Sequence, residues 1–286
     1  MTSTLVRHDQ PHSESTSPHD LCARTRDWAE IQERMLVPLY EAVYERLEVG
    51  SGTRLLGLGC GSGLALLMAA RRGASVTGVD SSSPEQLDLA RERLVSDAAP
   101  GTRAWHGARL IDGDPADAAV PAGPAYNLVT AFQPIGCMAG DSEGLGELLA
   151  AAAPLAERGA RVVLAGWGPP ERCSTSSVLR VATKLADPLR STGSWRPARR
   201  DDLEEVAQRA GLRPDGSGRV ACPFGYADMD SAVRGLLSTG LFDAAAEATD
   251  QVQVDKELTE ALHPHQRSDG TVWMPNIFRY LIARTA

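Results

Sequence analysis

Short apolar runs alternate along the chain with segments whose apolar residues recur every three or four positions. Runs of the first kind are typical of buried strands, and the second spacing is typical of helices that bury one face. Strands that alternate with helices in this way predict parallel pairing with right-handed crossovers. We therefore expect an α/β fold with a Rossmann-like, doubly wound, seven-stranded sheet. The expected strands are 54–58, 75–80, 108–111, 126–132, 161–167, 219–224 and 271–283.

Helices are expected between these strands and also outside them. Residues 25–47 have helical spacing, and Pro38 inside this segment predicts a kink or two separate helices. Two insertions, 169–200 and 227–268, interrupt the alternation after the fifth strand, and we expect them to form a cap or lid over the ligand edge of the sheet. The remaining expected helices are 64–72, 84–96, 145–157, 177–186, 201–210, 229–237 and 242–262.

The ends of the sequence and its composition narrow the possibilities. Residues 1–22 are rich in Ser, Pro and His and predict a disordered tail, so the domain is expected to span 23–286. The net charge of −8 argues against a nucleic-acid partner, because binding to phosphates relies on clustered Lys and Arg. The hydrophobic content of 43% is ordinary for a globular protein with a buried core. No apolar run approaches the roughly 20 residues that a membrane span needs.

The five cysteines are widely spaced and form no C-x-x-C pair. This pattern favours a reduced, cytoplasmic setting over a disulfide framework, and it gives no metal site. His263 and His265 stand at a helix end without a carboxylate or thiol at ligand spacing, so we interpret them as structural. His106 is interpreted in the same way, as a surface or edge-strand residue.

A glycine-rich segment lies between the first expected strand and the helix that follows it. Its sequence is Leu58-Gly59-Cys60-Gly61-Ser62-Gly63. Glycine permits positive φ and lets backbone N–H groups approach a ligand. Asp80 ends the next strand, 17 residues after Gly63, where a carboxylate can accept hydrogen bonds from ribose hydroxyls. The alternative interpretation is a tight strand–helix turn followed by a capping aspartate.

This segment, followed by Gly78-Val79-Asp80, resembles the first two motifs of class I S-adenosylmethionine-dependent methyltransferases. Segments 161–170, 223–226 and 276–280 resemble a bacterial natural-product branch of that family. The resemblance implies S-adenosyl-L-methionine as cofactor and methylation of a small-molecule acceptor, and its natural-product branch implies a secondary metabolite as that acceptor. The cofactor-binding residues that it implies are Gly59, Cys60, Gly61, Gly63, Asp80, Ser81, Asp114 and Phe132.

The sequence departs from the family pattern at several positions. Gly57 stands where the family usually has a carboxylate, Pro115 removes a backbone donor near the adenine, Asn127 replaces an Asp, and Ala160 replaces a glycine. Losing one charged hydrogen bond costs about 1.5–3 kcal/mol. Two alternatives therefore stay open: an enzyme of this fold that catalyses a cyclisation, elimination or rearrangement, and a non-enzymatic partner subunit with a vestigial pocket. For the chain itself we expect a homodimer.

The candidate substrate-binding residues lie at the carboxyl ends of strands or on flanking helices. Gln133 follows the fourth expected strand and Trp167 ends the fifth, at the edge where ligands bind in such sheets. Tyr40 and Tyr226 could reach the pocket from neighbouring elements, and core packing is the alternative for both. No residue stands out as the catalytic base.

Overall fold

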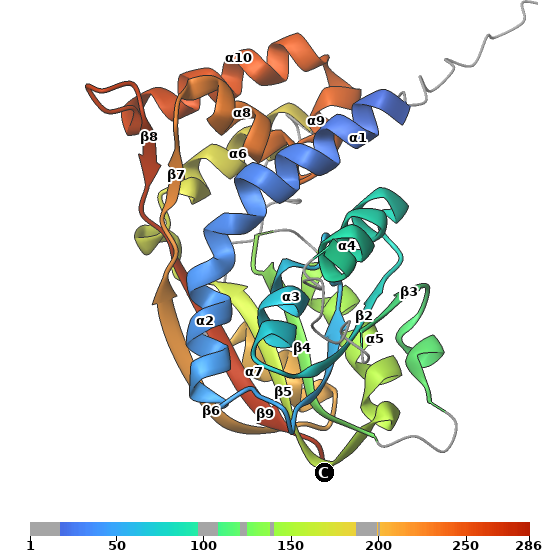
Figure 1. The fold of residues 1–286 in the computed structure, drawn as a ribbon. Coiled ribbons are helices and arrows are strands. Elements are labelled where there is room, and N and C mark those ends of the chain that lie inside the picture. Colours follow the sequence, from blue (N-terminus) through green and yellow to red (C-terminus); the bar gives the residue numbers. More distant parts are fainter. Residues whose placement is uncertain (1–17, 97–107, 121–124, 138–139, 187–198, 200) are drawn as a thin grey trace, which may run out of the picture.

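A seven-stranded sheet forms the centre of the computed structural model, with strand order β3-β2-β1-β4-β5-β9-β6 (Figure 1). The structure describes residues 18–96, 108–120, 125–137, 140–186, 199 and 201–286. A second sheet pairs β7 with β8. The strands are β1 Arg54–Leu58, β2 Ser75–Asp80, β3 Arg109–Asp112, β4 Tyr126–Ile135, β5 Ala156–Trp167, β6 Arg213–Ala221, β7 Phe224–Tyr226, β8 Val272–Met274 and β9 Ile277–Arg284.

Helices flank both faces of the sheet and gather above its carboxyl edge (Figure 1). Near the N-terminus, α1 Pro18–Asp27 continues through a π-helical turn, η1 Trp28–Gln32, and a 3₁₀ turn, η2 Glu33–Leu36, into α2 Val37–Arg46. Pro38 lies in the first turn of α2, where its missing N–H costs nothing, so the predicted break is present. The other α-helices are α3 Leu64–Arg71, α4 Pro84–Ser96, α5 Asp141–Ala152, α6 Thr175–Ala186, α7 Asp202–Arg209, α8 Met229–Leu237, α9 Asp243–Ala248 and α10 Gln251–Leu262; the remaining 3₁₀ turns are η3 Pro115–Ala118, η4 Ala153–Leu155, η5 Pro170–Arg172 and η6 His263–His265.

The strand order confirms the doubly wound fold and gives it one point of reversal. β1 pairs in parallel with β2 on one side and with β4 on the other. The chain proceeds outward from β1 to β3 and then returns to build β4 and β5 on the opposite side. In open α/β sheets the ligand crevice lies at the carboxyl ends of the strands where the order reverses. Here that point lies between β1 and β4.

Several sequence-based boundaries are wrong. The expected strand 219–224 is divided between β6, which begins at Arg213, and β7 of the second sheet. The expected strand 271–283 is two strands, because Pro275 and the buried Asn276 separate β8 from the antiparallel β9. The expected helix 145–157 begins at Asp141 and ends at Ala152, since Pro154 cannot continue it. The expected helix 242–262 divides where the Asp250 carboxylate accepts from Gln253 N (2.7 Å) and caps a new helix.

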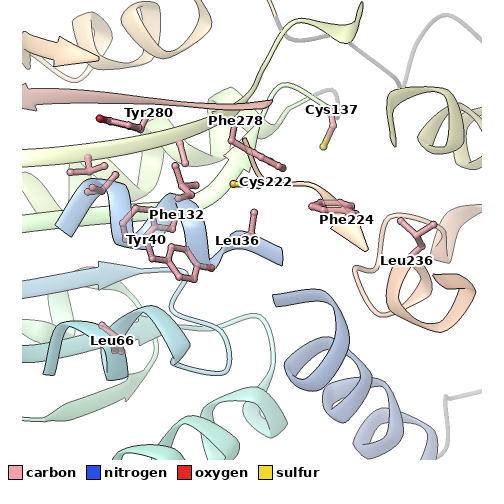
Figure 2. Packing of buried hydrophobic residues seen from close by; sticks show 14 of the residues in the cluster. Leu36, Tyr40, Leu66, Phe132, Cys137, Cys222, Phe224, Leu236, Phe278 and Tyr280 are labelled. Atoms are coloured by element: carbon pink, nitrogen blue, oxygen red, sulfur yellow. The ribbon is translucent and has the colours of Figure 1, made fainter. Parts of the chain in front are cut away.

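Each face of the sheet has its own hydrophobic core. Helices α2 and α3 cover one face, where Leu39 and Leu66 pack with Leu55 of β1. Helices α5 and α7 cover the other face. The first cluster continues into the cap through Leu236 and Leu258. Figure 2 shows part of this cluster. The cap is therefore held to the sheet by continuous apolar packing.

The cap contains α6, α8, α9 and α10, and α6 packs against both α9 and α10. These helices fall within the predicted lid segments 169–200 and 227–268, although 187–198 and 200 lie outside the described residues. Helix α1 packs against α4 and α8, and its Arg24 pairs with Asp243 at 2.9 Å. It begins at Pro18, inside the predicted tail, of which residues 1–17 lie outside the described part.

Candidate functional site

Two neighbouring cavities open at the point where the strand order reverses. The loop cavity, about 590 Å³, is lined by the glycine-rich segment, Asp80, and residues of η2 and α2. The apolar cavity, about 580 Å³, lies between the ends of β4 and β5 and the cap. Both volumes are in the range of small-molecule sites. Residues lining both cavities are Trp28, Leu36, Leu58, Gln133, Pro134 and Thr239.

The glycine-rich segment turns sharply between β1 and α3. Gly59, Gly61 and Gly63 all have positive φ, at +59°, +51° and +77°. A Cβ atom on Gly63 would lie 2.8 Å from the Cβ of Ala90, so close packing of α4 also requires glycine there. Gly59 and Gly61 instead line the loop cavity. The turn therefore presents bare backbone to the cavity.

Asp80 joins the end of β2 to this turn. The residue is buried, and its Oδ2 accepts from Gly61 N at 2.7 Å. Its Oδ1 accepts from both the backbone N–H and the hydroxyl of Ser82, at 2.8 and 2.5 Å. An ionised carboxylate has roughly four acceptor positions, so one remains for a ligand. The carboxylate is thus fixed against the turn.

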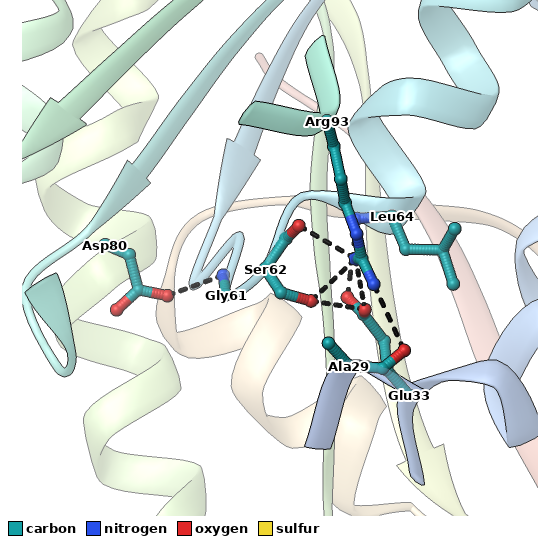
Figure 3. A network of polar contacts seen from close by, with 7 residues as sticks. All are labelled: Ala29, Glu33, Gly61, Ser62, Leu64, Asp80 and Arg93. Carbon is teal, nitrogen blue, oxygen red and sulfur yellow. Dashed lines mark hydrogen bonds and ion pairs between the residues drawn. The ribbon is translucent and has the colours of Figure 1, made fainter. Parts of the chain in front are cut away.

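Glu33 holds the turn from the opposite side (Figure 3). Its buried carboxylate accepts from the Ser62 hydroxyl and from Arg93 Nη1, the latter at 2.7 Å. Arg93 also donates to Ser62 O (2.9 Å) and to Ala29 O (3.1 Å). Sequence reasoning missed this network, because its hydrogen-bonded partners lie 29 to 64 residues apart and no local spacing connects them.

The structure also explains why residue 57 is glycine. A Cβ atom at Gly57 would lie 2.9 Å from Leu66 Cδ2, so a carboxylate there would require Leu66 to move. Glu33 lines the same cavity and brings an acidic group from η2. The acidic group lost from the end of β1 therefore has a counterpart on the N-terminal segment.

The structure brings together five of the eight predicted cofactor residues. Gly59, Cys60, Gly61, Asp80 and Phe132 line the loop cavity.

The other three, Gly63, Ser81 and Asp114, are not among its lining residues. Asp114 is exposed, and its side chain accepts from Ala116 N at 2.9 Å to cap η3, which begins at Pro115. A cofactor contact by Asp114 stays a prediction.

The four predicted substrate residues separate into different environments. Gln133 lines both cavities and Trp167 lines the apolar one, while Tyr40 lines the loop cavity. Tyr226 lines neither, because its buried hydroxyl donates to Gln32 Oε1 at 2.9 Å.

Two other sequence features lie away from both cavities. Asn127 accepts from Arg54 N (2.8 Å) and donates to Gly52 O (2.9 Å) at the amino ends of the strands, so its replacement of Asp does not touch the site. His263 and His265 lie on η6 and line neither cavity, and burial lowers the pKa of His265. His106 lies outside the described residues.

Cys60 lines the loop cavity, and burial beside Asp80 raises the pKa of its thiol to about 12. The thiol is therefore protonated throughout the physiological range and is a poor nucleophile, because alkylation requires the thiolate. We expect iodoacetamide at pH 8 to modify the exposed Cys22 at least about tenfold faster than Cys60, as measured by peptide mass spectrometry. Equal rates would show that the thiol ionises readily.

The described part of the chain contains neither a membrane-spanning helix nor a cluster of metal ligands. No helix there has both the length and the apolar character for a membrane span. Likewise, no group of three or more His, Cys, Asp or Glu side chains is arranged there to hold a metal ion.

Comparison with known proteins gives a family match over the site. Residues 56–138 match the family model described as a methyltransferase domain, and this segment contains the glycine turn, Asp80 and the end of β4. That family uses S-adenosylmethionine, which is the cofactor expected from the sequence. No curated protein matches the chain.

Solved structures show the same fold at low sequence identity. YjhP from E. coli aligns with a TM-score of 0.54 at 18% identity, covering 92% of this chain and 99% of that one. YcgJ from Bacillus subtilis gives 0.53 at 14% identity, covering 86% and 97%. Magnesium protoporphyrin IX methyltransferase from Synechocystis, solved with bound SAH, gives 0.51 at 15% identity, covering 95% of each chain.

These findings confirm the resemblance found in the sequence. Residues 56–138 carry the sequence of a methyltransferase domain, and the chain has the fold of the class I S-adenosylmethionine-dependent methyltransferases.

Proposed function

We propose that this protein transfers a methyl group from S-adenosylmethionine to a small-molecule acceptor. The observation that carries the proposal is the pair of adjoining cavities with a shared wall. One is bounded by the glycine turn and Asp80, and the other is predominantly apolar. Such a pair can hold a nucleotide-type donor and an acceptor next to each other.

The residues of the loop cavity fit the parts of S-adenosylmethionine. Asp80 has one acceptor position left for a ribose hydroxyl, and the bare turn at Gly59 and Gly61 allows close approach of the methionine portion. Glu33 lines the same cavity, and although its Oε2 is paired with Arg93, its Oε1 can accept from the cationic end of the cofactor. The indole Nε1 of Trp28 is buried without a hydrogen-bond partner among the described residues, which leaves a donor for the cofactor's carboxylate.

When bound, S-adenosylmethionine supplies an electrophilic methyl group on its sulfonium. The contribution of the chain is to position the acceptor and to exclude water, and such positioning accounts for a large part of the rate in methyl transfer. Gln133, in the shared wall, is the polar side chain best placed to orient an acceptor between the two cavities.

Calorimetric titration with S-adenosylmethionine and S-adenosylhomocysteine tests the proposal. We expect one site per chain for each compound, and no binding of NAD or ATP as nucleotide controls. Turnover is then followed as formation of S-adenosylhomocysteine in the presence of candidate acceptors. Absence of binding by both sulfur nucleotides would remove the proposed activity.

A second candidate is an enzyme of the same fold that binds the cofactor and catalyses a cyclisation, elimination or rearrangement. Gly57 favours this candidate, because the family's cofactor motif usually has a carboxylate at that position and Leu66 occupies the space that its side chain would need. Conversion of an acceptor without formation of S-adenosylhomocysteine would identify this activity. A secondary-metabolite acceptor, a cytoplasmic location and a homodimer stay predictions.

A further inference from the structure

The lining of the apolar cavity differs sharply from that of the loop cavity. The loop cavity is bounded by Glu33, Asp80 and the hydroxyls of several serines. In the apolar cavity, by contrast, most lining side chains are hydrocarbon or aromatic. They include Leu36, Ile135, Leu148, Trp167, Phe224 and Phe278.

Three aromatic rings form one end of this cavity. Trp167 and Phe278 have ring centroids 4.5 Å apart, and Trp167 meets Phe224 edge-on at 5.9 Å. Phe224 and Phe278 are stacked at 6.0 Å; both are labelled in Figure 2. All three line the cavity. Phe224 and Phe278 are 3% and 0% exposed, so they support the half-buried Trp167, whose indole offers the flat surface against which a planar apolar group can pack.

Charge is almost absent from the walls. Among the lining residues that the structure describes, none is Lys, Arg or His, and Asp141 is the one carboxylate. Its Oδ2 accepts from Gly136 N at 2.7 Å and from Cys137 N at 3.1 Å, which ties the group to the loop after β4. An anionic ligand would thus be buried without a counter-ion, at a cost of several kcal/mol.

The hydroxyl groups of the lining are also engaged. Thr175 Oγ1 accepts from Asn276 Nδ2 at 2.8 Å, and Thr239 Oγ1 donates to Leu236 O at 2.6 Å. Two amides remain. Gln32 uses Oε1 to accept from Tyr226, so its amide N–H groups, which have no partner among the described residues, stay available.

Gln133 is exposed, and its Oε1 lies 3.2 Å from the position of a Cβ on Gly59. Gln133 lines both cavities. Gln32 lines the apolar cavity, and the next residue, Glu33, lines the loop cavity. The two amides therefore lie on the side of the apolar cavity that faces the loop cavity.

We propose that the apolar cavity takes an uncharged, mainly hydrophobic acceptor, with a flat ring portion against Trp167, which Phe224 and Phe278 support, and a neutral polar atom at Gln32 and Gln133. This assignment of substrate class rests on the proposed function. It separates the acceptor from phosphorylated, carboxylated and cationic metabolites.

Three pyrene derivatives of nearly equal size test the assignment: the neutral 1-pyrenemethanol, the anion pyrene-1-sulfonate and the cation 1-pyrenemethylammonium. Their binding is measured by fluorescence on the full chain saturated with S-adenosylhomocysteine. We expect the neutral compound to bind at least about tenfold more tightly than either ion, because the anion meets no counter-ion and the Asp141 carboxylate is already held by Gly136 N and Cys137 N. Equal or tighter binding of an ion, or no binding of the alcohol, would overturn the proposal.

Leu148→Trp and Leu155→Trp show where the probe binds. Both leucines are half-buried and pack against the same core cluster, but only Leu148 lines the apolar cavity. We expect Leu148→Trp to weaken binding of 1-pyrenemethanol at least about tenfold by filling the cavity, and Leu155→Trp to leave it within about twofold. Equal effects of the two variants would place the probe elsewhere and contradict the assignment.

Binding of S-adenosylhomocysteine, measured separately by calorimetry without a probe, keeps the two proposals distinguishable. If the sulfur nucleotide fails to bind, the proposed function fails, whatever the pyrene series shows. If it binds to the parent chain and to both tryptophan variants while the neutral probe shows no preference, only the substrate class is wrong.

Discussion

Replacing Asp80 with alanine will lower the affinity for S-adenosylhomocysteine at least about tenfold. The carboxylate is buried at the end of β2 and fixed by Gly61 and Ser82, so its remaining acceptor position is held in place for a ribose hydroxyl before the ligand arrives. A hydrogen bond to a charged group contributes about 1.5–3 kcal/mol, which corresponds to about one to two orders of magnitude in affinity.

Asp112→Ala is the matched control for this prediction. Asp112 ends β3 directly beside Asp80 in the parallel register, but it is exposed and does not line the loop cavity. Its removal should leave the dissociation constant within about twofold, with both variants measured by calorimetry. Asp80→Asn, which keeps an oxygen for the Gly61 N–H, should give an intermediate loss.

A loss of less than about threefold in Asp80→Ala would contradict the ribose assignment. If that variant unfolds, Asp80→Asn decides the question, because an amide preserves the shape of the corner between β2 and the turn. Unchanged affinity in a folded Asp80→Asn variant would have the same meaning.

The features that could be predicted from the sequence are those that depend on residues close together in the chain. The glycine spacing from Gly59 to Gly63 placed a turn between β1 and α3, and the apolar run ending in Asp80 placed a carboxylate at the next strand end. Because parallel strands bring their carboxyl ends to one edge, these local signals were enough to predict that Asp80 and the turn would meet.

The missed features depend on pairs that only the fold brings together. Glu33 meets Arg93 across 60 residues, and Tyr226 reaches Gln32 across 194. From the sequence Tyr226 could reach the pocket from a flanking helix, with core packing as the alternative, and its buried hydroxyl donates to Gln32. Single-sequence periodicity identifies which positions are buried, and it does not say which distant side chain satisfies a buried polar group.

Glu33 is the missed residue whose replacement should have the largest effect on stability. We expect Glu33→Ala to lower the free energy of unfolding by about 3 kcal/mol, because removing one member of a buried ion pair leaves the other charge uncompensated. The side chains of Glu33 and Arg93 are 4% and 18% exposed, and Ser62 loses its acceptor in the same change. Urea denaturation at pH 7, with m-values compared, measures the difference.

Glu157→Ala provides the comparison with an exposed pair. Glu157 lies 2.6 Å from Arg54, but their side chains are 44% and 33% exposed, so its loss should cost no more than about 1 kcal/mol. The double replacement of Glu33 and Arg93 by methionine removes both charges and should recover part of the stability lost in Glu33→Ala. If Glu33→Ala costs no more than Glu157→Ala, the network does not hold the glycine turn. The N-terminal segment that carries Glu33 would then contribute to the loop cavity without fixing the turn.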